Sequence, residues 1–171
     1  MSLESLIPVS EEAISSMALN PKQALGRSIE IHTKQSGFPE IQGCKIAIIG
    51  LEETRNAFFP VVGCQLDDFR KSFYQLFPGN WNFKICDLGN LPNGETPEDT
   101  YFALKEICHY LKQINVVTIV LGGSHDMVFP LYKSYQMNKQ LVNIVSLDNQ
   151  FDFSQEEELI SGRSYMSRII M

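Results

Sequence analysis

Positive charge is scarce in this sequence. The chain has 14 lysine and arginine residues against 20 aspartates and glutamates, and its formal net charge is −6. Proteins that bind nucleic acid or an anionic membrane surface carry clustered lysine and arginine, and no such cluster occurs here. No apolar run is long enough to span a bilayer either. We therefore expect neither nucleic acid nor a membrane among the partners.

Paired cysteines and a signal sequence are also missing. The cysteines are widely spaced, at Cys44, Cys64, Cys86 and Cys108. Without a Cys-x-x-Cys pair, the chain has neither a zinc knuckle nor a redox motif. Cys44 and Cys86 lie at or within apolar runs, where a free thiol behaves as a small core residue. The start, MSLESLIPVSEE, lacks a basic region followed by an apolar stretch. We expect reduced thiols, no signal peptide and a cytoplasmic location.

Glycine patterns that hold nucleotides are absent as well. The first strong apolar run ends at Gly50, but no Gly-x-Gly-x-x-Gly pattern follows it, and no Gly-Lys-Ser or Gly-Lys-Thr occurs. Those patterns arrange backbone amides around phosphate groups. Their absence argues against a nucleotide-binding α/β domain.

The chain does have a regular alternation of predicted strands and helices. Its 171 residues, 44% of them hydrophobic, are enough to bury a core. Short apolar runs predict buried strands at residues 45–50, 83–88, 116–121 and 141–147. Helical spacing and helix-start residues predict helices at residues 10–17, 66–77, 96–113 and 127–135, with a last helical segment before Met171. This order predicts an α/β fold with a parallel, doubly wound sheet.

A polar cluster follows the third predicted strand. Gly122 and Gly123 allow a tight turn that a Cβ atom would block, so that His125 is presented at a strand end. Ligands of open parallel sheets bind beyond the carboxyl ends of the strands. The plainer interpretation is a solvated His125, with Asp126 capping the next helix. This cluster by itself favours the plainer interpretation.

A second polar cluster follows the fourth predicted strand. Asp148, Gln150 and Asp152 alternate, and alternate side chains of an extended backbone share a face. Two carboxylates placed in this way repel each other, and a cation offsets the repulsion. The plainer interpretation is that Asp148 caps a turn and Asp152 is solvated. With His125 on the same rim of the sheet, however, the carboxylates form a ligand set suited to Mn²⁺, Zn²⁺ or Fe²⁺.

Other polar residues give weaker signals. His32 and His109 are isolated histidines, for which a surface or core position is a better interpretation than a metal ligand. Asn56 follows the first apolar run on the same expected rim, and a role in a turn suits it better than contact with a substrate.

Together the two clusters resemble motifs of the arginase, agmatinase and formiminoglutamase family. The phrases LGGSHDMVFPL and SLDNQFDF resemble its Gly-Gly-x-His and Asp-x-His-x-Asp motifs in residue type, strand context and spacing. The formiminoglutamase branch is the most similar, because Phe151-Asp152-Phe153 resembles its Phe-Asp-Leu. The resemblance implies a three-layer αβα sandwich with a mainly parallel sheet, incomplete at the C-terminus. Residues 1–40 would be an extension packed on a partial domain at residues 41–171.

The resemblance also implies a role for each site residue. His125 would bind the first metal, Asp148 would bridge both metals, and Asp152 would bind the first. Gln150 stands where the family has a histidine ligand of the second metal. In the family two ions, usually manganese, share a hydroxide that attacks a guanidinium or formimino carbon. The implied activity is metal-dependent hydrolysis of a C–N bond in a linear amidine or guanidine.

Two departures from the family pattern limit that expectation. Gln150 offers a neutral amide oxygen in place of an imidazole nitrogen, which is a poorer ligand for a borderline metal. The family's later Asp-x-Asp pair has no counterpart before Met171. We therefore expect weak or partial Mn²⁺ binding and no activity from this chain alone. The alternative function is a non-catalytic family member that acts as a binding or assembly module.

The family's last strands also have no counterpart in this chain, and two of them lie between its third and fourth strands. We therefore interpret the chain as a fragment of a longer protein or as a truncated product that dimerises. In either case exposed sheet edges favour association, including formation of a homo-oligomer.

Overall fold

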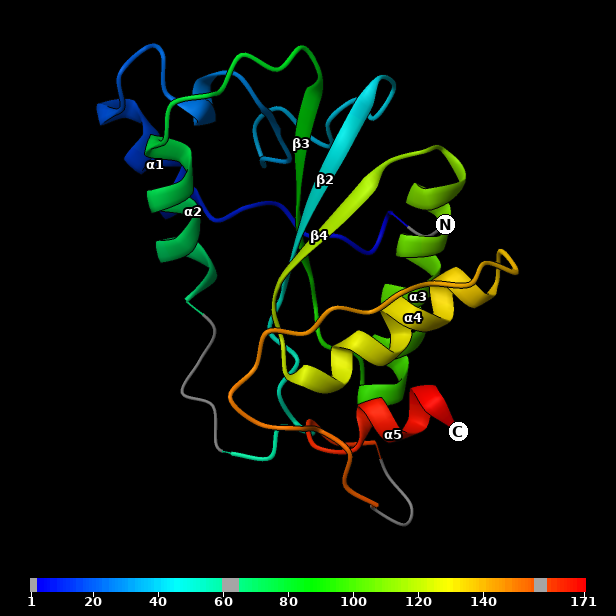
Figure 1. Cartoon of the computed structure of the whole chain (residues 1–171). Helices are drawn as coiled ribbons and strands as arrows, with labels where there is room; N and C mark the ends of the chain where they lie inside the picture. Colours follow the sequence, from blue (N-terminus) through cyan, green and yellow to red (C-terminus); the bar gives the residue numbers. More distant parts are fainter. Residues whose placement is uncertain (1–2, 60–64, 156–159) are drawn as a thin grey trace.

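The fold is built on a parallel sheet of four strands (Figure 1). The computed structural model describes residues 3–59, 65–155 and 160–171. The strand order is β1-β3-β2-β4. The strands are β1 (Glu30–Ile31), β2 (Cys44–Leu51), β3 (Lys84–Leu91) and β4 (Val117–Gly122). Every pairing in this sheet is parallel, which confirms the predicted sheet type.

Helices cover both faces of the sheet (Figure 1). One face carries α1 (Glu11–Ser16) and α2 (Leu66–Gln75), and the other carries α3 (Pro97–Gln113), α4 (Val128–Gln136) and α5 (Tyr165–Ile170). Short 3₁₀ turns occupy Met17–Leu19, Leu25–Arg27 and His125–Met127. The three layers confirm the predicted αβα architecture. None of the helices in the described ranges is long and apolar enough to cross a membrane.

The larger part of the core lies between the sheet and α3. Leu104, Ile107 and Leu111 of α3 are fully buried against β2, whose Ile49 and Leu51 are fully buried as well. The start of α3 follows from its sequence. The Thr96 side chain accepts a hydrogen bond from Asp99 N, and Asp99 accepts one from Thr96 N, which together form a capping box.

A buried ion pair joins α2 to β3 on the opposite face. Arg70 and Asp87 have fully buried side chains, and Arg70 Nε lies 2.8 Å from Asp87 Oδ2. The Tyr74 hydroxyl donates to the same carboxylate at 2.7 Å, and Arg70 also donates to Asn90 Oδ1 at 2.6 Å. Burial and the nearby Asp87 carboxylate raise the pKa of Tyr74. Each buried charge is therefore paired and hydrogen-bonded, as burial requires.

The N-terminal residues contribute to the same sheet, since Glu30 and Ile31 pair with Cys86 and Asp87 of β3. The division of the chain at residue 40 stays a prediction. Cys44, Cys86 and Cys108 are free and buried, as expected for core thiols, while Cys64 lies outside the described residues. Burial raises the pKa of the Cys86 and Cys108 thiols to about 12.

The prediction of a fourth strand at residues 141–147 is wrong. This segment has no regular secondary structure, and Leu141, Val145 and Leu147 are almost fully exposed. An apolar run becomes a strand only when a neighbouring strand takes its backbone hydrogen bonds. Among the described residues no strand pairs with this segment, since the only strand paired with β4 is β2.

β4 is an edge strand with exposed apolar side chains, which predicts self-association of the chain. Val117 and Ile119 of β4 are 63% and 41% exposed. An open, apolar edge strand is a template for pairing with another chain. We propose that two copies associate through this edge. Ile119→Lys should weaken the association at least about tenfold, because lysine on an edge strand opposes pairing. Sedimentation velocity over a range of concentrations measures it.

The control is Leu19→Lys, since Leu19 is 92% exposed and lies in a 3₁₀ turn outside the sheet. An equal effect of the two substitutions, or a monomer at every concentration, would contradict association through β4.

Candidate metal centre

A glycine turn places His125 at the carboxyl-end rim of the sheet. Gly122 and Gly123 have φ angles of 81° and 76°, which L-residues rarely adopt. A Cβ on Gly123 would lie 2.9 Å from Met127 Cγ and 3.0 Å from Leu51 Cδ2, so that position requires glycine. Ser124 N then donates to Glu53 O at 2.9 Å. This bond ties the turn after β4 to the chain that leaves β2.

His125, Asp148 and Asp152 meet at this rim. His125 Nδ1 lies 3.0 Å from Asp152 Oδ2 and 3.1 Å from Asp148 Oδ2. One ligand atom from each residue lies within 4.8 Å of the other two. The exposed fractions of the side chains are 51% for His125, 15% for Asp148 and 2% for Asp152. The sequence prediction that these three side chains converge therefore agrees with the geometry, while their role as ligands stays a prediction.

The donor set suits a divalent cation. A single imidazole N–H cannot satisfy two carboxylate oxygens fully, and two adjacent carboxylates repel each other. Asp152 Oδ1 is also buried without a hydrogen-bond partner among the described residues. A buried, unpaired carboxylate oxygen is costly, and a cation between the three side chains offsets that cost. One nitrogen and two carboxylates are ligands that Mn²⁺ accepts.

Local hydrogen bonds orient the second cluster even though no strand precedes it. Asp148 Oδ1 accepts hydrogen bonds from Asn149 N at 2.7 Å and Gln150 N at 3.3 Å, which leaves Oδ2 toward His125. Farther along, Ser154 N donates to Arg163 O at 3.0 Å. The turn role expected of Asp148 as the plainer interpretation is therefore real, and it is compatible with the cluster.

Gln150 lies at the same hollow as two of the three converging side chains. It lines a hollow of about 340 Å³ together with Asp148, Asp152 and Tyr165. The Tyr165 ring approaches His125 edge-on, with 6.4 Å between ring centroids. The sequence prediction that Gln150 belongs to the same site is consistent with this position. Its amide adds a neutral oxygen and no charge to the site.

A second layer of polar residues behind His125 was not predicted from the sequence. Asp126 is fully buried and accepts a hydrogen bond from the Tyr101 hydroxyl, which accepts one from Asn56 Nδ2 at 2.8 Å. Burial and the bond to Asp126 raise the pKa of Tyr101. The expectation that Asp126 caps the following helix is wrong, because that helix has no side-chain cap. Its carboxylate faces the core and holds Tyr101.

Asn56 lies in a turn, as expected, which Ala57 N closes by donating to Thr54 O at 3.0 Å. Its backbone O also accepts from Gly162 N at 2.9 Å. The isolated histidines lie elsewhere. His32 is buried with Nδ1 3.0 Å from Leu88 O, and His109 contacts Gln113 on α3. Neither joins a group of metal-ligating side chains in the described part of the chain.

A buried glutamate supports the turn that carries His125. The Glu53 side chain is fully buried and accepts from Arg55 Nε at 2.9 Å and Thr100 Oγ1 at 2.9 Å. Arg55 Nη1 also donates to Glu95 O at 2.7 Å. Burial alone would raise the pKa of Glu53, but the hydrogen bonds from Arg55 and Thr100 outweigh burial and lower it below its usual value. This cluster joins the loop after β2 to the start of α3.

Comparison with known proteins gives the class of fold. No protein-family model and no curated protein matches the chain. Among solved structures, formimidoylglutamase from Bacillus subtilis subsp. subtilis str. 168 matches with a TM-score of 0.70 and 14% identity, over 86% of this chain and 48% of that chain. Trypanosoma cruzi formiminoglutamase with Mn²⁺ matches with a TM-score of 0.70 and 15% identity, over 88% and 52%.

A hypothetical agmatinase from Burkholderia thailandensis matches with a TM-score of 0.67 and 16% identity, over 86% of this chain and 49% of that chain. The chain thus spans about half the length of the solved structures that it matches. Over that half it has the αβα fold of these formiminoglutamase and agmatinase structures. The resemblance predicted from the two motifs is therefore confirmed at the level of the fold.

The lowered pKa of Glu53 predicts how acid affects the protein. Because the folded-state pKa lies below that of an unfolded glutamate, about 4.3, the charged form contributes its full stability above that pH. The contribution is lost as the pH falls through the folded pKa. Glu53→Gln should lower the free energy of unfolding at pH 7 by about 1–3 kcal/mol, and the difference from wild type should shrink below about pH 4.

Urea unfolding from pH 3 to pH 7 measures this difference. Glu52→Gln is the matched control, because Glu52 is exposed and adjacent in sequence. A difference that does not change with pH would show that the Glu53 carboxylate is not the group that titrates.

Proposed function

We propose that this chain is a divalent metal-binding module of the arginase, agmatinase and formiminoglutamase (ureohydrolase) type, whose ancestral activity is hydrolysis of a C–N bond in a linear amidine or guanidine and whose metal site is degenerate in this chain. The observation that carries the proposal is the convergence of His125, Asp148 and Asp152 within 4.8 Å at the carboxyl-end rim. The likeness to ureohydrolase structures, one of them described with Mn²⁺, supports it.

Each of the three side chains has a distinct part in holding the ion. Asp152 is almost fully buried, so its carboxylate would contribute a charge with little competition from water. Asp148 is held by two backbone N–H groups and would contribute Oδ2. His125 would contribute Nδ1 from the more exposed side. When bound, a divalent cation supplies Lewis acidity, which polarises a substrate and makes water a stronger nucleophile near neutral pH.

Gln150 favours one ion over two. Its neutral amide oxygen would contribute less to a second ion than an imidazole nitrogen, and the described residues offer no further carboxylate within the group. We propose that Mn²⁺ binds at a single position and with partial occupancy. The same residue supports the second candidate function, a non-catalytic relative that binds or assembles without turnover.

The finer assignments are also proposals. Phe151-Asp152-Phe153 resembles the formiminoglutamase motif, so formiminoglutamate is the first substrate to test. Location in the cytoplasm is proposed from the free, buried thiols of Cys44, Cys86 and Cys108.

Metal titration tests the site directly. Isothermal titration calorimetry with Mn²⁺ should give at most one ion per chain. His125→Ala and Asp152→Asn should each weaken binding at least about tenfold, because each removes one of few ligands. His109→Ala is the control, since His109 lies on α3 and contacts Gln113. Two tightly held ions per wild-type chain would contradict a weakened second position, and no binding at all would remove the proposed centre.

A hydrolysis assay separates the two candidate functions. With Mn²⁺ present, this chain should release neither formamide from formiminoglutamate nor urea from arginine or agmatine above the uncatalysed rate. We expect no turnover because Gln150 is a weak metal ligand and the described group contains only two carboxylates. Gln150→His should raise the Mn²⁺ stoichiometry toward two, because an imidazole replaces the amide. Turnover by the wild-type chain that is lost in His125→Ala would instead make it a working hydrolase.

A further inference from the structure

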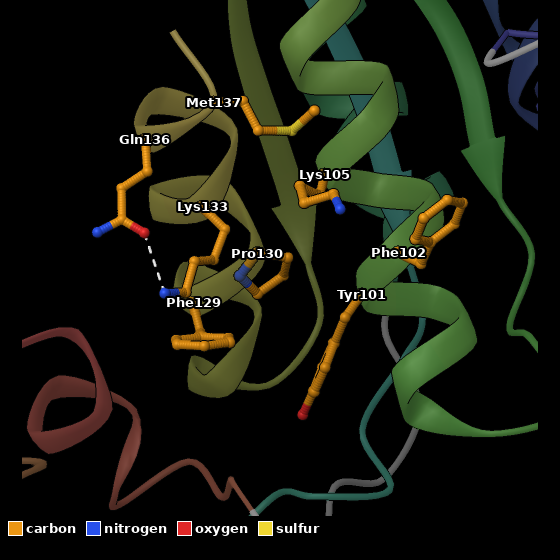
Figure 2. A pocket seen from close by; sticks show the side chains of 8 residues that line it. All are labelled: Tyr101, Phe102, Lys105, Phe129, Pro130, Lys133, Gln136 and Met137. Atoms are coloured by element: carbon orange, nitrogen blue, oxygen red, sulfur yellow. Dashed lines mark hydrogen bonds between the residues drawn. The ribbon is translucent and has the colours of Figure 1, made fainter. Parts of the chain in front are cut away.

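A groove between α3 and α4 shares no lining residue with the hollow beside the metal centre and has no role in the proposed function. It has a volume of about 520 Å³, within the usual range of small-ligand sites. The residues that form its walls include Tyr101, Phe102, Lys105, Phe129, Lys133 and Met137. In Figure 2, Tyr101 and Pro130 lie between the two helices, with Phe102 on the α3 side and Phe129 on the α4 side.

The groove exposes large apolar side chains to water, which is unfavourable. Phe102 is 61% exposed and Met137 is 44% exposed. Tyr101 forms a fixed wall, because its hydroxyl is bonded to Asp126 and Asn56 and points away from Met137 in Figure 2. A rigid aromatic wall beside exposed apolar side chains suits a flat apolar ligand, which gains contact area without reordering the site.

The charge at this groove is opposite to that of the whole chain. Lys105 Nζ lies 4.7 Å from the centroid of the Phe102 ring, and Lys133 Nζ lies 5.1 Å from that of Phe129. Lys133 also donates to Gln136 Oε1 at 3.0 Å, a neutral partner. Lys105 is paired with Glu106 at 3.2 Å, but Glu106 does not line the groove. In a chain of net charge −6, a groove lined by two lysines and no acid attracts an anion.

We propose that the groove binds a small amphipathic anion with a flat apolar body and one carboxylate. The apolar body packs against Tyr101, Phe102 and Met137, and the carboxylate binds to the lysine ammonium groups of the groove wall. The ligand class follows from the combination of aromatic rings and lysines. The rings supply contact area, and the ammonium groups supply charge-assisted hydrogen bonds.

The test uses 2-naphthoate as the probe and the methyl group of Met137 as the reporter. The protein is labelled with [¹³C-methyl]methionine, and Met137→Leu assigns the signal among the 6 methionines. We expect 2-naphthoate to shift the Met137 signal saturably. The neutral analogue 2-naphthylmethanol should bind at least about fivefold more weakly. Lys105→Gln/Lys133→Gln should weaken 2-naphthoate binding about tenfold, which corresponds to about 1.4 kcal/mol.

The matched control is Lys22→Gln/Lys45→Gln, which changes the net charge equally at exposed positions and should leave binding unchanged. Three results would overturn the proposal: no shift of the Met137 signal, equal affinity for the acid and the alcohol, or an equal loss in both double variants. A Met137 signal that moves with protein concentration and no longer responds to naphthoate would also overturn it, because a second copy would then occupy the groove.

Discussion

Parallel pairing brings the carboxyl ends of strands to one edge of a sheet, and in this chain the register of β2 with β4 decides which residues meet there. Leu51 pairs with Gly122, so both strands end at the same level. Two residues farther along each chain, Ser124 N donates to Glu53 O. The position of His125 therefore depends on the pairing of β2 and β4 and on the buried Glu53 side chain that fixes the loop after β2.

The polar groups near this rim are of two kinds. Glu53, Arg55 and Thr100 satisfy one another and join the loop after β2 to α3. Asp126 and Asp152 each retain a buried carboxylate oxygen without a partner among the described residues. Satisfied networks give rigidity, and the unsatisfied oxygen of Asp152, whose carboxylate lies beside His125, supports the proposed cation site. A rigid frame around an incompletely satisfied acidic group is what a metal site needs.

Much of the fold could be predicted because the signals are local. The Thr96 capping box and the apolar spacing of α3 depend on residues within one helix. The apolar runs at β2 and β3 lie in the centre of the sheet, and the run at β4 pairs with β2. The run at residues 141–147 looks the same in sequence, but strand formation depends on a partner that no local pattern reveals. The role of Asp126 was missed for a similar reason, since its partner Tyr101 is 25 residues away.

The convergence of the three candidate ligands could be predicted even though one predicted strand was wrong. Asp148 and Asp152 do not need a strand before them, because Asp148 is oriented by its own backbone turn and Asp152 is buried against the rim. A second ion would need further negative charge close to Asp148. Gln150, which lines the same hollow as Asp148, would contribute only a neutral oxygen, and a neutral ligand does not offset the repulsion between two divalent cations. For this reason our proposal is a single cation, held mainly by the buried Asp152, and not a dinuclear centre.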